Sequence, residues 1–106
     1  MGDVILIKSE ALLRTNNAAA GLVIVNNLRG DRGSIPMATL TLDNMIDERG
    51  REMYLETWRR QDLIRFGKYL LPFQEKSETS DPKYLLFPIP NGQLAANPNL
   101  AANPGY

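Results

Sequence analysis

The sequence predicts an all-α fold that consists of an αα-hairpin, a long third helix and an extended C-terminal tail. Apolar residues recur at helical spacing within residues 3–14, 17–28 and 41–71 of the 106-residue chain. A short break separates the first two segments, which is typical of two antiparallel helices. Near the C-terminus, Pro88 and Pro90 each remove a backbone donor, so this part of the chain cannot form a central strand.

Residues 3–29 are predicted to form the helix pair. The buried side of the first helix should consist of Ile5, Leu6, Leu12 and Leu13. Either asparagine in Thr15-Asn16-Asn17 can cap the second helix, whose alanines allow close approach to its neighbour. The second helix should end within Arg29–Pro36, where glycine and proline follow the last periodic residue. Such a hairpin is the unit of tetratricopeptide-like repeats, although the chain holds no second copy.

Residues 41–71 are predicted to form one long helix. Thr41 is a favourable N-cap, and Pro72 prevents the helix from continuing. A bend is expected near Gly50 or Thr57. This segment is the most informative part of the chain because it is rich in both charged and apolar residues.

The apolar stripe of the long helix also carries charges, since Arg49, Glu56 and Arg60 project from its middle. A second apolar patch lies around the other side and consists of Tyr54, Leu55, Trp58 and Phe66. The helix should therefore lie between two layers, with Trp58 packed inside. Isolated charges in a core are strongly destabilising, so acids and guanidiniums must neutralise one another there. Helical spacing places three pairs of charged residues three or four positions apart, namely Glu52 and Glu56, Glu56 and Arg60, and Arg59 and Asp62.

Residues 72–106 are predicted to form a loop and an extended tail. Gln74–Pro82 is polar and should be a solvated loop. Tyr84–Gly92 should be extended and packed through its side chains, with a turn at Asn91-Gly92. The apolar residues of this Pro- and Asn-rich tail favour packing of the tail on the helices.

Composition excludes several classes of function. Lys plus Arg and Asp plus Glu number 12 each, so no net charge draws the chain to nucleic acid or anionic lipid. The chain has no cysteine and no histidine, which excludes disulfides, thiolate or imidazole metal sites and triads that need either residue. No cofactor and no metal are expected.

Stretches along nearly the whole chain resemble the signatures of one family. Asp47–Tyr54 and Arg59–Lys68 resemble the ERxREL…EGxRxxDLIRWG signature of the SusD/RagB outer-membrane nutrient-binding lipoproteins. Leu86–Pro90 and Asn97–Tyr106 match the fPIP…NP.L.QNPGY ending of that family. Parts of Ser9–Gly33 resemble the helix pair that precedes these motifs, so the order also agrees.

The resemblance implies a non-enzymatic glycan-binding component of an uptake system in the outer membrane of Bacteroidota. Members of this family are surface-exposed lipoproteins that lid a TonB-dependent transporter of the SusC type and pass oligosaccharide to it. They are longer than this chain and begin with a signal and an acylated cysteine, which the chain lacks. Residues 1–106 are therefore predicted to be a single domain, the C-terminal fragment of such a protein, in which Glu48–Arg65 holds the scaffold.

No catalytic residue is assigned. Glu48, Glu52 and Glu56 could be paired carboxylates of a glycoside hydrolase, but the arginines around them should keep them ionised. A structural ion network is the preferred interpretation. The Arg29-Gly30-Asp31 tripeptide, an integrin-recognition sequence, coincides with a helix end and is interpreted as such.

Ligand-binding residues are left unknown, because the sugar-stacking aromatics of the family lie mostly in upstream segments. Aromatic faces stack on the apolar faces of sugars, and Tyr69, Phe73 and Tyr84 border the polar loop, so these three are the residues to test. The alternative function is a free-standing helical module that binds protein partners. In either case the fragment should self-associate, because Val4–Ile7 would otherwise expose an apolar patch.

Overall fold

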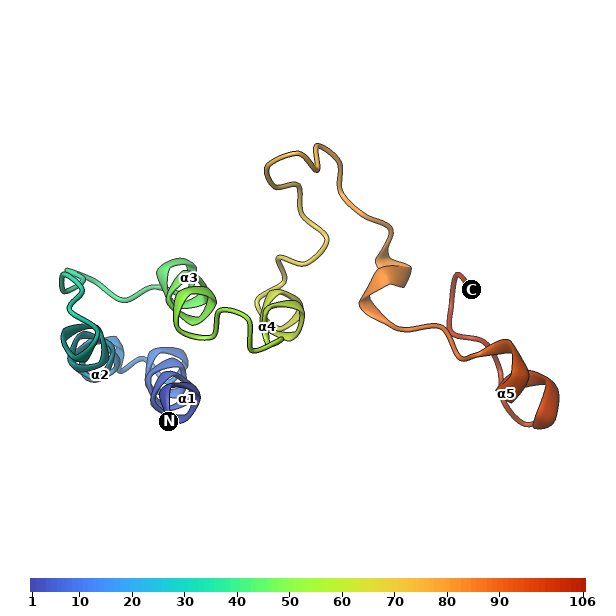
Figure 1. Cartoon of the computed structure of the whole chain (residues 1–106), viewed down its shortest axis with the longest axis horizontal. Coiled ribbons are helices and arrows are strands. Elements are labelled where there is room, and N and C mark those ends of the chain that lie inside the picture. The colour runs from blue at the N-terminus through green and yellow to red at the C-terminus, as the bar shows by residue number, and fades with distance from the viewer. The chain divides into compact units, whose positions relative to one another are not determined.

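The computed structural model describes every residue of the chain, Met1–Tyr106, and it is helical (Figure 1). Its elements are α1 (Gly2–Arg14), α2 (Ala18–Asp31), α3 (Leu42–Glu52), α4 (Arg59–Arg65), the 3-10 helix η1 (Pro82–Leu85) and α5 (Asn91–Ala96). Strand-like pairing is limited to an isolated bridge between Phe73 and Lys76. The all-α prediction is therefore confirmed.

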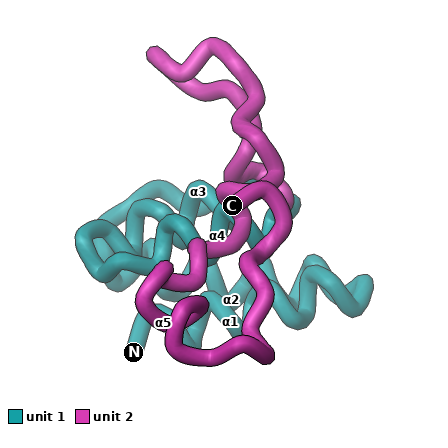
Figure 2. The backbone as a smooth tube through the Cα atoms, turned by 90° about the vertical axis from the view of Figure 1, so that its right-hand side faces the viewer, with its two compact units in different colours: residues 1–66 teal, residues 67–106 magenta.

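The chain divides into two compact units, Met1–Phe66 and Gly67–Tyr106 (Figure 2). The first unit holds α1 to α4 and the buried core, and the second holds η1 and α5. The single domain over residues 1–106 stays a prediction, as does the packing of the tail on the helices.

The predicted αα-hairpin is present. The side chain of Asn17 accepts a hydrogen bond from the backbone of Ala20 and so caps α2. The two helices pack closely, and the buried hydroxyl of Ser9 on α1 donates to the carbonyl of Gly21 on α2 across 2.8 Å. A Cβ atom at Gly21 would lie 2.9 Å from the backbone oxygen of Ser9, so the glycine is what allows this approach.

The second helix ends within Arg29–Pro36 as predicted, but two residues beyond the end of the predicted helix pair, 3–29. It continues through Gly30 to Asp31, and the left-handed residue that follows it is Gly33, with φ of +67°. Ser34 then donates its backbone N–H to the carbonyl of Arg29, which closes the helix end. Gly33 rather than Gly30 therefore acts as the terminating glycine.

The hydrophobic core lies between α1, α2 and the start of α3. Its buried members are Leu6, Val25, Leu28, Leu40 and Met45. Partly buried residues surround them, namely Ile5, Leu13, Leu22, Met37 and Phe66. Of the side predicted to be buried on the first helix, only Leu6 is fully enclosed.

The prediction of a single long helix over residues 41–71 is wrong. Thr41 does cap α3, in a capping box with Asn44, but α3 ends at Glu52 and α4 begins at Arg59. Between them Leu55 and Thr57 have positive φ values of 66° and 64°.

The break allows a buried arginine on α3 to reach its acidic partner on α4. Arg49 on α3 forms a 2.8 Å ion pair with Asp62 on α4. On one continuous helix these two residues would be about 20 Å apart along the axis, at a rise of ~1.5 Å per residue. A turn in the chain is required to bring them together, and helical periodicity cannot reveal a turn that serves a distant contact.

The break also explains why the prediction for Trp58 is wrong. Trp58 lies at the end of the non-helical segment and is 36% exposed, and Tyr54 and Leu55 in the same segment are more exposed still. Phe66, by contrast, packs against the core as predicted. The second apolar patch exists only on a continuous helix, so most of it is absent here.

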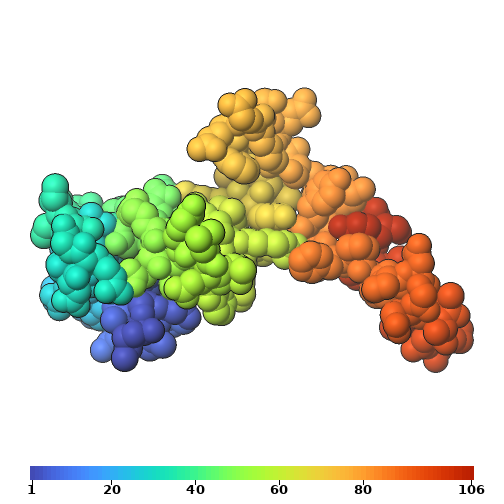
Figure 3. All heavy atoms as spheres, viewed as in Figure 1, coloured from blue at the N-terminus to red at the C-terminus, as the bar shows by residue number.

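The second unit consists of a loop and a tail that folds on itself. The side chain of Asp81 accepts from the backbone N–H of Lys83 and caps η1, so Tyr84 and Leu85 are helical instead of extended. Asn91-Gly92 begins α5 instead of forming a turn. The loop around residues 72–80 stands out as a lobe of this unit (Figure 3).

Side chains hold the end of the tail to its own beginning. Asn103 donates from its side-chain amide to the carbonyl of Phe87 across 2.7 Å. The hydroxyl of Tyr106 lies 3.1 Å from the carbonyl of Leu86 and 3.3 Å from that of Lys83. Side-chain to backbone bonds therefore hold this proline-containing part of the tail, where Pro88 and Pro90 have no backbone N–H to donate.

Candidate functional site

A buried ion cluster joins three helices of the first unit. Arg49 on α3 donates through Nε to Asp62 on α4 at 2.8 Å and through Nη2 to Asp3 on α1 at 2.9 Å. Arg49 is 2% exposed and Asp62 is 1% exposed. The predicted charge network inside a helical layer is therefore confirmed, but its partners come from different helices.

A third carboxylate, that of Glu10, extends this cluster. Glu10 on α1 accepts hydrogen bonds from both terminal nitrogens of Arg65 on α4, at 2.7 and 2.8 Å, and one from Arg14. Burial alone would raise the pKa of Glu10, but the bonds from Arg65 and Arg14 outweigh burial and hold the pKa below its ordinary value. Its carboxylate raises the pKa of Arg65 in turn. Arg65 also reaches Asp62 at 3.0 Å, so the two carboxylates share this cation.

Two of the three carboxylates considered for hydrolysis are paired with arginines. Glu48 accepts from Arg29 on α2 and from Arg51 on its own helix. Glu52 accepts from Arg32 on α2, with oxygen and nitrogen 2.7 Å apart. These pairs join α2 to α3 and keep both acids within reach of positive charge, which suits a brace and not a general acid.

The third carboxylate, Glu56, lies on the exposed segment between α3 and α4. Glu56 and Arg60 lie on opposite sides of the start of α4, and their predicted pairing stays a prediction. Arg59 donates to the backbone carbonyl of Ile46 at 2.8 Å. Arg49 and Arg65, each from outside the predicted pairs, are the residues that bind Asp62.

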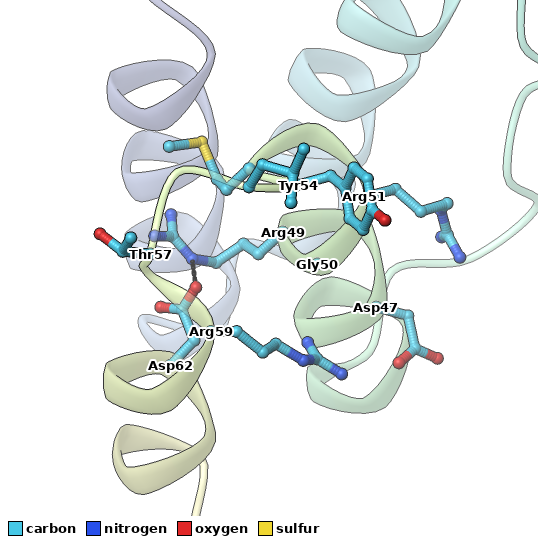
Figure 4. A pocket seen from close by; sticks show the side chains of 10 residues that line it. Asp47, Arg49, Gly50, Arg51, Tyr54, Thr57, Arg59 and Asp62 are labelled. Carbon is cyan, nitrogen blue, oxygen red and sulfur yellow. Dashed lines mark hydrogen bonds and ion pairs between the residues drawn. The ribbon is translucent and has the colours of Figure 1, made fainter.

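A cavity of about 610 Å³ lies beside the buried cluster (Figure 4). It is lined by α3, the segment between the helices and α4, with Asp47, Arg49, Gly50, Arg51, Met53, Tyr54, Leu55, Thr57, Arg59 and Asp62. The chain contains no cluster of acidic, histidine or cysteine side chains that could hold a metal ion. Most of the charged residues that line the cavity are already engaged in ion pairs or backbone contacts. This lining offers no activated nucleophile.

The aromatic residues selected from the sequence do come together. Tyr69, Phe73 and Tyr84 line one hollow of about 370 Å³ in the second unit, together with Lys76 and Ser80. The two polar residues were not singled out in the sequence. No sequence signal separates them from the other polar residues of this loop, because only the closed loop decides which side chains face the hollow.

The Arg29-Gly30-Asp31 tripeptide is not displayed as a recognition loop. It forms the last turn of α2, and Arg29 is engaged with Glu48 and with the carbonyl of Ile35 at 2.8 Å. The helix-end interpretation is confirmed.

The chain is similar to known proteins over its whole length. No helix has both the length and the apolar character needed to cross a membrane. The sequence model of the SusD family matches residues 1–106. Starch-binding protein SusD of Bacteroides thetaiotaomicron is 35% identical over 115 residues, which cover 100% of this chain and 20% of that protein. The chain thus spans about a fifth of the length of that relative. A match over every residue shows that the chain belongs to the SusD family.

Proposed function

We propose that this chain is the C-terminal portion of a non-enzymatic glycan-binding protein of an outer-membrane nutrient-uptake system. Membership of the SusD family supports this proposal, and the relative at 35% identity is named for starch binding. An α-glucan is accordingly the first ligand to test. The full-length protein would be a surface-exposed lipoprotein that passes oligosaccharide to a TonB-dependent transporter of the SusC type.

Within that protein, residues Glu48–Arg65 hold the scaffold together. The observation that carries this role is the buried guanidinium of Arg49, which binds Asp62 on α4 and Asp3 on α1 at once. Breaking a buried ion pair by removing one partner costs about 3–5 kcal/mol, because a charge is left without compensation. Such a cluster fixes the arrangement of helices but provides no reacting group.

Co-purification from outer membranes tests the uptake role. The full-length protein carrying an affinity tag should copurify, after mild detergent extraction, with the TonB-dependent transporter encoded next to it. An unrelated tagged lipoprotein of the same membrane serves as the control. Recovery of the protein without that transporter, or the absence of a transporter gene beside its own, would contradict the proposal.

A free-standing interaction module is the second candidate, and one observation favours it. Val4 and Ile7 lie on α1 at helical spacing and are 66% and 50% exposed. This pair of apolar side chains can be covered by a second copy of the chain. Sedimentation velocity of the 106-residue chain should show dimers or larger species that Val4→Lys with Ile7→Lys converts to monomer. A monomer at every concentration would exclude self-association.

A further inference from the structure

The hollow in the second unit is built by a loop that its own hydrogen bonds hold in place. Phe73 and Lys76 exchange backbone hydrogen bonds of 2.9 Å, and Ser80 donates its N–H to the carbonyl of Leu70. The ammonium group of Lys76 donates to the carbonyls of Leu70 and Leu71 at 2.7 and 2.8 Å. These bonds fix the loop before any ligand arrives, which lowers the entropy cost of binding.

Two aromatic rings of the hollow are exposed within this chain. Phe73 is 62% exposed and Tyr84 is 49% exposed. No residue of the second unit is fully buried, so these rings have no core of their own to enter. Exposed apolar surface grouped around a concave site and bordered by polar groups marks a binding site.

The chemistry of the lining matches a sugar ring. Lys76 directs two of the three donors of its ammonium group to backbone carbonyls, and the same group lies over the Phe73 ring, 5.9 Å from its centroid, so it borders the aromatic face of the hollow. Ser80 places a hydroxyl-bearing side chain in the same lining. A ring with one apolar C–H face and hydroxyls at its edge would satisfy both the aromatic and the polar groups.

The volume also limits the ligand. At about 370 Å³, the hollow lies at the small end of the ~300–1,000 Å³ range of ligand sites. We infer that this hollow is a subsite for one neutral pyranose residue of a glycan, with Phe73 and Tyr84 against its C–H face and Lys76 and Ser80 at its hydroxyls. The choice of a sugar over another ring rests on the proposed function.

Calorimetric titration of the 106-residue chain with neutral hexasaccharides tests this subsite. Maltohexaose, cellohexaose, mannohexaose and xylohexaose serve as the probes. At least one should bind, and Phe73→Ala and Tyr84→Ala should each weaken binding by about tenfold or more, as expected when an apolar ring contact is lost. Phe73→Trp should retain binding because it keeps the aromatic face.

Matched controls exist in the same chain. Phe87→Ala and Tyr54→Ala remove exposed rings of the same two types outside the hollow, and they should bind like the unmodified chain. Circular dichroism of each variant checks that the fold is kept.

Two outcomes would overturn the subsite. One is binding that Phe73→Ala and Phe87→Ala weaken equally, and the other is no binding of any hexasaccharide by the chain. Neither outcome changes whether the full-length protein copurifies with its transporter, so failure of the subsite and failure of the proposed function can be told apart.

Discussion

Arg49 and Asp62 are bonded at 2.8 Å although they lie on separate helices, and both are almost completely enclosed. The non-helical segment 53–58 makes this contact possible, since it returns the chain toward α3. One consequence is that two residues in that segment adopt positive φ values. Another is that the stability of the first unit should depend on the pair.

Removal of Asp62 should destabilise the protein strongly. Asp62→Ala leaves the buried guanidinium of Arg49 with one acidic partner, Asp3, so the free energy of unfolding should fall by about 3–5 kcal/mol. Urea denaturation followed by circular dichroism measures this. Asp47→Ala, which removes an exposed carboxylate of the neighbouring helix, should change stability by less than about 0.5 kcal/mol. Equal losses in the two variants would show that the buried pair is not stabilising.

Acid should weaken the protein partly through Glu10. Its pKa in the folded protein is depressed, so its contribution to stability is present above the ordinary pKa of 4.5 and is lost as the pH falls through the folded value. The free energy of unfolding should therefore drop below about pH 4.5 less steeply in Glu10→Gln than in the unmodified chain. Gln74→Asn, at an exposed site of the loop, changes no ionisable group and should keep the original pH dependence. Parallel curves for all three proteins would contradict the assignment.

A methyl group at Gly21 should separate α1 from α2. The added Cβ would lie 2.9 Å from both the backbone oxygen of Ser9 and the Cδ2 atom of Leu40. Gly21→Ala should therefore cost about 1–3 kcal/mol of stability, as overpacking does. Gly30→Ala is the matched control, because nothing lies within 4 Å of the new atom and the helix should gain about 0.5–1 kcal/mol. Thermal melts of both variants distinguish the two effects, and a stable Gly21→Ala protein would exclude close packing.

Glycine should be tolerated at Leu55. Its φ of 66° lies in the left-handed region, which costs an L-residue with a side chain about 1–2 kcal/mol, and its side chain is exposed. Leu55→Gly should therefore leave the melting temperature unchanged or raise it. Gln61→Gly, in the exposed side of α4, should lower stability by about 1 kcal/mol. A loss at Leu55 as large as that at Gln61 would mean that the leucine side chain makes a stabilising contact.

The aromatic hollow shows how far local sequence can locate a site. Tyr69, Phe73 and Tyr84 stand at the borders of a polar loop, and a loop that closes must bring its borders together. Their clustering was therefore predictable. The places of Lys76 and Ser80 were not, because they depend on which way each side chain of the closed loop points.

Local sequence patterns were enough to predict the helical class, the hairpin, the cap at Thr41 and the need for acids and arginines to pair. Each of these follows from interactions within a turn or two of chain or from the cost of a buried charge. Which acid each arginine binds depends on how the helices pack. The Arg49–Asp62 and Arg65–Glu10 ion pairs join different helices. The break at residues 53–58 allows the Arg49–Asp62 pair to form. Apolar periodicity predicts a helix for as long as the local pattern lasts. It does not predict which acid a buried guanidinium binds, because that partner lies on another helix.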